Sequence, residues 1–343
     1  MNLTIFVLIW VGLSFVISLA GALLVAQRGF HWGLIDSPNV RSSHRVPVPK
    51  GGGIGILVVF VVAALWWHMP WTLWIPACII SLVSLLGDYR DVSFKIRLAV
   101  HVGAAAIFSG SLFFARSIPE VSAGITVLLF VLGIFYITAT ANYYNFMDGI
   151  NGIAGLTGTI AFSCLGLFGL LEGKDTAWVA PAFGIAAACL GFLPLNFPRA
   201  RVFMGDVGSM LLGFLFGCWV LWFSQSLLEF VVLTSFLFPF YVDELSTLIV
   251  RIKDRERLTR AHRRHIYQIL VNQAGLSHAV VTVLYGFIQI VVAVSAWVAI
   301  REGSIQLVGL LIFLSCLFFG GGMYIRRRWE VRKQEGLNEL GAI

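Results

Sequence analysis

The chain has 343 residues, of which 59% are hydrophobic and only 12% are charged. Soluble globular proteins are about half apolar and about a quarter charged, so this composition excludes an ordinary soluble domain and indicates a polytopic membrane protein. The net charge of +7 is therefore first an indication of membrane topology, and we infer no nucleic-acid partner from it.

Eleven apolar runs of about 17 to 22 residues divide the sequence, and runs of that length cross a bilayer as helices. We therefore predict an all-α polytopic membrane protein with about eleven transmembrane helices, in which residues 1–343 form one integral-membrane domain. The predicted spans are residues 3–25, 53–69, 71–87, 98–114, 125–141, 150–170, 178–195, 207–223, 227–247, 279–300 and 304–324.

The lysines and arginines are very unevenly distributed over the connections between these spans. With eleven spans, 21 of the 24 fall on one side of the membrane. The positive-inside rule places that side in the cytoplasm, so we predict a periplasmic N-terminus and a cytoplasmic C-terminus. The connections with unusual polar residues lie on the same side. The expected active-site loops are residues 28–52, 88–97, 142–152, 196–206 and 248–278.

The first of these loops ends in three glycines, residues 51–53, at the mouth of the second span. Free N–H groups at such a helix start favour an anion, and His44 and Lys50 would add positive charge. The alternative is a flexible loop that is basic only because it faces the cytoplasm.

The second loop begins with Asp88 and Asp91, which lie three residues apart at the end of a span. Carboxylates at that depth are costly unless they bind a cation or a base. Alternatively, they pair with Lys95 and Arg97.

The third loop carries Asn142, Asn145, Asp148 and Asn151, which recur every three residues up to Gly152. On a helix these side chains would share one slowly drifting face. A polar face with a carboxylate, where the chain leaves the bilayer, predicts a site.

In the fourth loop, Asp206 stands between Gly205 and Gly208, shortly after Arg199 and Arg201. A carboxylate at a helix start can be a simple cap. A cap alone does not explain the glycines and the paired arginines.

The fifth loop contains the basic cluster His262, Arg263, Arg264 and His265. Guanidinium groups are permanent bidentate donors to phosphate oxygens, whereas two arginines between the histidines would repel a metal ion. The alternative is attraction to anionic lipid headgroups. Upstream, Asp243 and Glu244 are expected to buttress the cluster.

Carboxylates suited to Mg²⁺, a basic cluster and glycine-rich turns together indicate a Mg²⁺-dependent phosphoryl or diphosphate enzyme at the inner membrane surface. A membrane transporter is the alternative from another class, because intramembrane carboxylates often mark ion pathways. Transporter sites lie near the bilayer midplane, often between inverted repeats, and the sequence has no visible repeat.

Several motifs resemble those of the polyprenyl-phosphate N-acetylhexosamine-1-phosphate transferases, which are glycosyltransferase family 4. They are Pro-Asn-Val-Arg-Ser-Ser-His, Pro-Lys-Gly-Gly-Gly, Asn-Tyr-Tyr-Asn-Phe-Met-Asp-Gly-Ile-Asn-Gly, Phe-Met-Gly-Asp-Val-Gly-Ser and His-Arg-Arg-His-Ile-Tyr-Gln, together with the Asp88 loop. They occur in family order between Asp36 and about His278. The resemblance implies that undecaprenyl phosphate attacks the β-phosphorus of a UDP-N-acetylhexosamine and that UMP leaves.

The resemblance also assigns roles to residues. Asp206 would be the principal ligand of Mg²⁺, for which Mn²⁺ can substitute, and Asp88 and Asp148 would complete the acidic centre with Asn145 orienting it. Substrates would be held by His44, Lys50, Asn151, Phe203, His262, Arg263, Arg264 and His265. Among these, Asn151 would hydrogen-bond the uracil and Phe203 would stack on it.

The chain departs from the family pattern at Gly87, where the family usually has an aspartate that is often suggested as a base. A phosphate monoester is mostly dianionic at neutral pH because its second pKa is about 6, so a base is optional. We therefore predict an active enzyme, with a catalytically inactive scaffold as the alternative.

The second departure concerns the sugar. The segment Arg263-Arg-His-Ile-Tyr-Gln268 resembles the branch that starts O-antigen chains of lipopolysaccharide on N-acetylfucosamine or N-acetylquinovosamine, with N-acetylglucosamine as the alternative. The muramoyl-pentapeptide branch is disfavoured because its triple-histidine loop is absent. The expected location is the bacterial inner membrane, with the active site facing the cytoplasm. The expected partners are undecaprenyl phosphate, the UDP-sugar and membrane lipids, and a homodimer is a candidate assembly.

Overall fold

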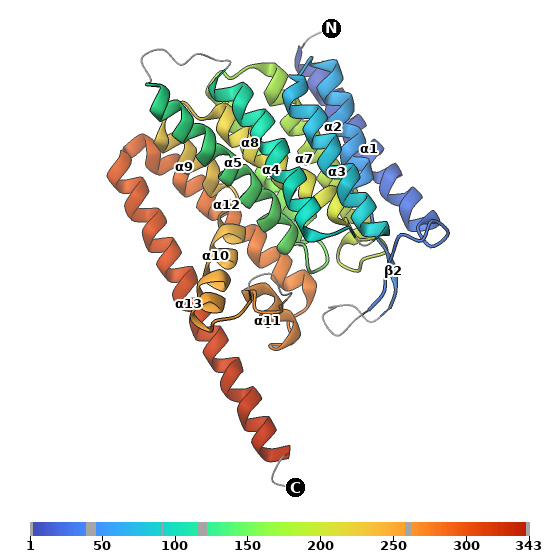
Figure 1. Ribbon diagram of the computed structural model, residues 1–343, viewed down its shortest axis with the longest axis vertical. Helices are drawn as coiled ribbons and strands as arrows, with labels where there is room; N and C mark the ends of the chain where they lie inside the picture. Colours follow the sequence, from blue (N-terminus) through green and yellow to red (C-terminus); the bar gives the residue numbers. More distant parts are fainter. Residues whose placement is uncertain (1–2, 39–45, 91, 115–121, 258–261, 341–343) are drawn as a thin grey trace.

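The computed structural model describes residues 3–38, 46–90, 92–114, 122–257 and 262–340, without the side chains of residues 302, 304 and 330–340. This part of the chain is a bundle of helices, with the two chain ends at opposite ends of the molecule (Figure 1). The helices are α1 (Leu3–Arg28), α2 (Ile54–Trp66), α3 (Trp71–Tyr89), α4 (Phe94–Phe113), α5 (Ala123–Phe146), α6 (Ile153–Leu171), α7 (Thr176–Asn196), α8 (Asp206–Phe223), α9 (Leu227–Ser235), α10 (Phe238–Lys253), α11 (Ile266–Asn272), α12 (His278–Glu302) and α13 (Ser304–Leu340).

The all-α membrane fold is confirmed, because nine helices of the described chain are long and apolar enough to cross a bilayer. Two of the eleven predicted spans have a different form. Helix α2 has 13 residues and is therefore only about 20 Å long, shorter than a hydrocarbon core of about 30 Å. The span predicted at residues 227–247 is broken into α9 and α10, because Pro239 in the first turn of α10 lacks the N–H that a continuous helix needs. The orientation of the bundle in the membrane stays a prediction.

Helix α8 lies at the centre of the bundle. Of the 18 residues in the apolar stretch of α8, 83% are buried. The corresponding share is 22% in α1 and 6% in α13, so α13 is at the periphery. The indole of Trp219 lies in the C-terminal part of α8, edge-on to Trp178 at 4.9 Å and to Phe162 at 6.1 Å between ring centroids. Its Nε1 donates to the carbonyl of Trp178, so this buried ring has no unsatisfied donor.

Glycines let other helices approach α8 at backbone distance, as is common where membrane helices pack. A Cβ at Gly213 would lie 2.7 Å from the Cα of Ala141 in α5. A Cβ at Gly53, just before α2, would lie 2.4 Å from the Cα of Gly208. The start of α2 therefore touches the first turn of α8.

The loops at this end of α8 are joined by backbone hydrogen bonds. The strands β1 (Ile35–Asp36) and β2 (Val48–Pro49) pair antiparallel. Beyond them, the N–H of Phe203 donates to Pro49 O at 2.8 Å, and the N–H of Gly52 donates to Phe203 O at 2.9 Å. The first and fourth predicted loops therefore form one structural unit.

We expect Gly53→Ala to lower the thermal unfolding midpoint of the detergent-purified protein, because the new methyl group would push α2 away from α8. Overpacking of this kind costs about 2 kcal/mol or more. Gly103→Ala is the matched control, because a Cβ there meets nothing within 4 Å. Equal midpoints for the two variants would contradict the close approach.

Candidate active site

Two carboxylates meet where α3 ends and α8 begins. Asp88 lies in the last turn of α3, and the N–H of Asp206, the first residue of α8, donates to Asp88 Oδ2 at 3.1 Å. Gly205 has a φ of +74°, and a Cβ there would lie 2.8 Å from the same oxygen. A residue without a side chain is therefore required for the two carboxylates to approach each other.

Each of these carboxylates is paired with a cation. Arg97 Nη1 donates to Asp206 Oδ2 at 3.0 Å, and Lys50 Nζ lies 3.2 Å from Asp88 Oδ1. Asn145 Nδ2 donates to Asp206 Oδ1 at 2.8 Å. We call these five residues the acidic corner.

Sequence reasoning assigned four of the five residues of the acidic corner to the site and missed Arg97. Arg97 entered only as an alternative partner of Asp88, but the structure pairs it with Asp206. Ser209 is a second site residue that the sequence reasoning missed, and its Oγ accepts a hydrogen bond from Asn145 at 2.9 Å. Its position could have indicated it, because Ser209 lies one helical turn after Asp206.

The third predicted loop is not a continuous helix. Helix α5 ends at Phe146, and Gly152, with a φ of +83°, precedes α6. The expectation of one polar helical face is therefore wrong: Asn145 lies on α5, whereas Asp148 and Asn151 lie in the turn after it. Gly152, in the left-handed conformation that glycine adopts readily, is the N-cap of α6 and marks the end of this turn.

Asp148 is half-buried in this turn. Burial raises the pKa of its carboxyl well above the usual range, and the charges of Asp206 and Asp88 raise it further. Asp148 is therefore within electrostatic reach of the acidic corner. Within the described residues, however, the three aspartates do not form a set of three metal-ligating side chains.

Asn151 is held from both sides. Its N–H donates to His278 Nδ1 at 3.1 Å, its carbonyl accepts from Thr282 Oγ1 at 2.8 Å, and its Nδ2 donates to Pro198 O at 3.2 Å. The neighbouring Gly152 N–H donates to Asn196 Oδ1 at 2.6 Å. The turn after α5 is therefore fixed between the loop before α8 and the start of α12.

Of the substrate-binding residues predicted in the first and fourth loops, the structure places Lys50 and Phe203 but does not describe His44. Phe203 is half-buried and adjoins Lys50 in a parallel β-bridge, so the structure brings these two together. His44, like Asp91 of the second loop, lies outside the described residues.

The structure does not gather the basic residues of the fifth loop into one phosphate-facing cluster. His265 is 2% exposed, and its Nδ1 lies 3.4 Å from Glu244 Oε2. Arg264 pairs with Asp254 and with Glu256, the latter at 2.7 Å. These two side chains are thus engaged with acidic residues of the protein, which the sequence pattern alone did not indicate.

His262 and Arg263 are half-buried. Burial, followed by the positive charge of His265 and nearby arginines, lowers the pKa of His262 to about 3. The imidazole of His262 is therefore neutral at physiological pH. It can donate or accept a hydrogen bond, but it adds no positive charge.

The basic segment, residues 262–267, is nevertheless docked onto the turn after α5. The hydroxyl of the buried Tyr267 donates to the carbonyl of Phe146 at 3.0 Å. A Cβ at Gly149 would lie 2.2 Å from that hydroxyl, so only glycine fits beneath Tyr267. This contact joins the last predicted loop to the loop that carries Asp148.

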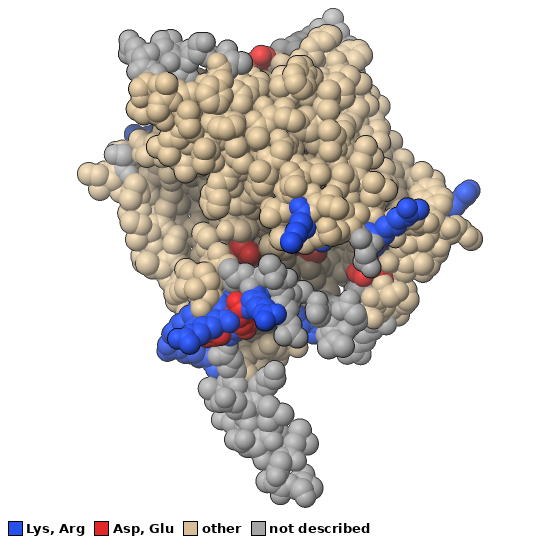
Figure 2. Space-filling view, viewed as in Figure 1, with Lys and Arg blue, Asp and Glu red and all other residues tan. Residues whose placement is uncertain are grey.

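Charged side chains gather toward this end of the molecule, whereas most of the bundle surface is uncharged (Figure 2). An apolar groove of about 420 Å³ runs between α5, α9, α10 and α13. Its lining includes Thr140 and Tyr143 of α5, and Tyr143 lies two residues before Asn145. Thr140 and Tyr241 share a hydrogen bond of 2.7 Å in its wall. An apolar groove thus reaches the helix that supports the acidic corner.

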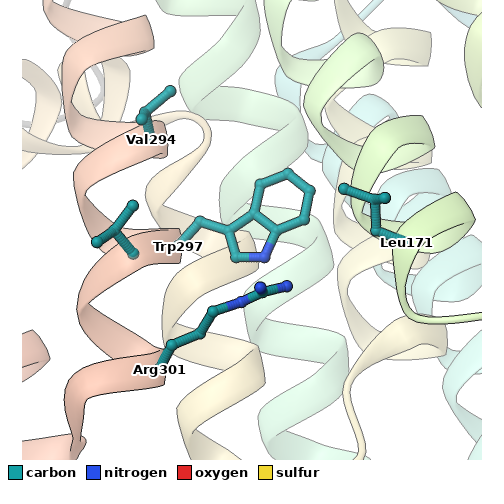
Figure 3. Close-up of a pocket in the computed structure, with 5 residues that line it drawn as sticks. Leu171, Val294, Trp297 and Arg301 are labelled. Atoms are coloured by element: carbon teal, nitrogen blue, oxygen red, sulfur yellow. The ribbon is translucent and has the colours of Figure 1, made fainter.

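A second hollow of about 240 Å³ lies at the far end of α12 (Figure 3). Leu171, Val294, Trp297, Val298 and Arg301 line it. Arg301 is 23 residues after His278, so roughly 35 Å of helix separates it from the start of α12, where His278 contacts Asn151. The hollow is separate from the candidate site.

Comparison with known proteins adds independent information. The sequence model of glycosyl transferase family 4 matches residues 70–224. The chain is 25% identical over 324 residues to the probable undecaprenyl-phosphate N-acetylglucosaminyl 1-phosphate transferase of Bacillus subtilis, covering 89% of each chain. It is 26% identical over 323 residues to the undecaprenyl-phosphate alpha-N-acetylglucosaminyl 1-phosphate transferase of Escherichia coli K12, covering 88% of this chain and 86% of that one. With the decaprenyl-phosphate N-acetylglucosaminephosphotransferase of Mycolicibacterium smegmatis it shares 31% identity over 212 residues, or 54% of this chain and 52% of that one.

Proposed function

Because the chain belongs to the polyprenyl-phosphate N-acetylhexosamine-1-phosphate transferases of glycosyl transferase family 4, we propose that it transfers a sugar 1-phosphate from a UDP-N-acetylhexosamine to undecaprenyl phosphate. The names of these relatives support the lipid acceptor and the type of reaction. The observation that carries the proposal is the acidic corner, where Asp88 and Asp206 approach within one hydrogen bond at the ends of two membrane helices.

In the proposed reaction, an oxygen of the lipid phosphate forms a bond to the β-phosphorus of the UDP-sugar. The bond between that phosphorus and the oxygen bridging to the α-phosphorus breaks, and UMP leaves with the electron pair. Phosphoryl transfer of this kind depends mainly on positioning and on neutralising charge. Lys50 and Arg97 are cations already fixed in the acidic corner, so they are suited to bind the phosphate oxygens.

We propose that Mg²⁺, or Mn²⁺ in its place, is held by Asp206 and Asp88, with the Asp148 carboxyl completing the acidic centre nearby. Mg²⁺ sites commonly use one or two carboxylates and complete their coordination with substrate phosphates, so a third protein ligand is not required. These two carboxylates suit a metal ion, because each already forms an ion pair with a cationic side chain. Positive charge is therefore favourable at both positions. When bound, the ion would neutralise the charge of the diphosphate.

The acceptor and the nucleotide can be assigned to neighbouring surfaces. The apolar groove between α5, α9, α10 and α13 suits a polyprenyl chain, because burial of apolar carbon is favourable there. Asn151 and Phe203, on the turn after α5 and on the loop before α8, are proposed to bind the uracil. His262 and Arg263, which are half-buried in the basic segment, are proposed to bind the diphosphate or the sugar.

Two kinds of UDP-sugar are proposed as the substrate. The Tyr267–Gln268 pair resembles the branch specific for N-acetylfucosamine or N-acetylquinovosamine, whose products start O-antigen chains. Both side chains, however, make internal contacts: Tyr267 bonds Phe146, and Gln268 accepts from the His265 N–H at 3.4 Å. The relatives' names specify N-acetylglucosamine, which makes UDP-N-acetylglucosamine the second candidate. In either case we propose an inner-membrane enzyme with its site facing the cytoplasm.

The direct test is to incubate the purified protein with undecaprenyl phosphate, Mg²⁺ and each UDP-N-acetyl sugar in turn, and to measure UMP. We expect release with one preferred donor, and Asp206→Asn should lower the rate by about 100-fold or more, as expected when a charged group acts in the transition state. Asp175→Asn is the matched control, because Asp175 caps α7 and asparagine caps equally well. Absence of UMP with every donor would refute the transferase, and near-normal activity of Asp206→Asn would refute the role of Asp206.

We further expect Gly87→Asp to change the rate by no more than a few-fold at neutral pH, because the lipid phosphate is already mostly dianionic. A Cβ at Gly87 would lie 4.0 Å from Arg97 Nη1, so the new carboxylate would compete with Asp206 for Arg97. Gly87→Asn controls for the added volume. An increase of orders of magnitude with aspartate alone would mean that a general base is needed.

A further inference from the structure

The last helix, α13, carries three consecutive arginines that resemble an ordinary cytoplasmic run of positive charge. The structure separates them. Arg326 is 3% exposed, whereas Arg327 and Arg328 are exposed. A buried guanidinium is costly unless it is paired and hydrogen-bonded, so the contacts of Arg326 define its role.

Arg326 contacts both α10 and the basic segment. Its Nη2 donates to Thr247 Oγ1 at 2.7 Å and to Ser246 Oγ at 3.1 Å, and its Nε donates to the carbonyl of Arg264 at 3.3 Å. The same Nη2 lies 3.7 Å from Asp243 Oδ1. One side chain of α13 therefore bridges α10 to the backbone immediately before α11.

Asp243 extends this bridge to the other elements. Its carboxylate is 0% exposed and accepts the N–H groups of Ile266 at 2.8 Å and Tyr267 at 3.2 Å, and the hydroxyl of Tyr285 in α12 at 2.7 Å. The negative charge of Asp243 and the positive charge of Arg326 thus compensate each other beneath the basic segment.

The shape of α13 is adapted to the same contact. Gly322 lies one helical turn before Arg326, and a Cβ there would be 2.3 Å from Ile266 Cδ1. Helix α13 thus packs against α11 at the residue whose N–H binds Asp243. Packing and hydrogen bonding act on the same few residues.

We propose that Arg326 is a positioning residue, through which α13 holds the basic segment against the turn after α5 and thereby sets the affinity for the anionic UDP-sugar. The proposal rests on the proposed function for the identity of that substrate. The path is continuous: Arg326 holds the Arg264 carbonyl and Asp243, Asp243 holds the amides of α11, and Tyr267 binds the carbonyl of Phe146. Arg326 itself does not need to touch the substrate.

The test compares Arg326→Met with Arg327→Met, which removes a neighbouring exposed charge from the same helix. Hydrogen–deuterium exchange without substrate should be about tenfold faster at the amides of Ile266 and Tyr267 in Arg326→Met only, because their acceptor loses its support. In the UMP assay, Arg326→Met should raise KM for the UDP-sugar about tenfold and change kcat by less than about threefold. Arg326→Lys should recover part of both effects, because it keeps the charge but loses the planar fork.

The two arms separate this inference from the proposed function. If the wild-type protein releases no UMP, the transferase is refuted, and the exchange arm still tests the positioning role. Equal exchange in Arg326→Met and Arg327→Met, or a fall in kcat with unchanged KM, overturns the inference. If Arg326→Met does not fold, Thr247→Val removes the shortest bond to Arg326 and should shift exchange and KM in the same direction by about threefold. A folded Thr247→Val protein with wild-type exchange and KM would equally overturn it.

Discussion

The hydrogen bond from the Asp206 N–H to the Asp88 carboxylate is the contact on which the rest of the site depends. It forms only because Gly205 leaves room at the start of α8 and because Gly53 lets α2 reach the same turn. Two carboxylates held this close repel each other and favour nearby cations. Lys50 and Arg97 supply that positive charge in the protein alone, and a metal ion with a diphosphate would supply it during the proposed reaction.

The site has a second half, which is built differently. The basic segment is anchored by internal ion pairs rather than presented as a free cationic surface: His265 faces Glu244, and Arg264 faces Asp254 and Glu256. Arg326 of α13, which faces Asp243, also binds the carbonyl of Arg264. The contact of the basic segment with the acidic half is the Tyr267–Phe146 hydrogen bond. Such an arrangement fixes the position of the segment at the cost of most of its free charge. Binding of an anionic substrate would then depend on geometry more than on net positive charge.

The sequence was sufficient for the fold class and for the two carboxylates of the acidic corner, for identifiable physical reasons. Apolar runs longer than a bilayer is thick can hardly be anything but membrane helices, and carboxylates beside glycines at their ends are too costly to be incidental. The division of the ninth predicted span into α9 and α10 was missed because Pro239 does not interrupt the hydrophobic run in the sequence. In the structure it stands in the first turn of α10, where proline is well tolerated. The three-residue spacing of Asn142 to Asn151 suggested a helix because periodicity does not reveal that α5 ends at Phe146 and that α6 begins only after Gly152.

Partners far apart in the sequence were the least predictable feature. Nothing in the sequence spacing connects Arg97 with Asp206, or Arg326 with Asp243, because each pair is formed by helices that meet only in the folded bundle. A run of arginines likewise does not disclose which of its members is buried. Conversely, the composition of His262 to His265 suggested one cluster that holds the diphosphate or helps to select the sugar, whereas tertiary contacts give its members different environments.

The central claim is that the acidic corner binds the metal and the diphosphate. It is tested most directly by a crystal structure of the protein with Mn²⁺ and the UDP-sugar, in which anomalous scattering locates the ion. The account predicts one strong peak for the ion at about 2.1 Å from carboxylate oxygens of Asp206 or Asp88, with the diphosphate beside the ion. Arg97 or Lys50 should then be turned toward the phosphates. A nucleotide and ion bound elsewhere, with Arg97 still on Asp206 and Lys50 still on Asp88, would contradict it.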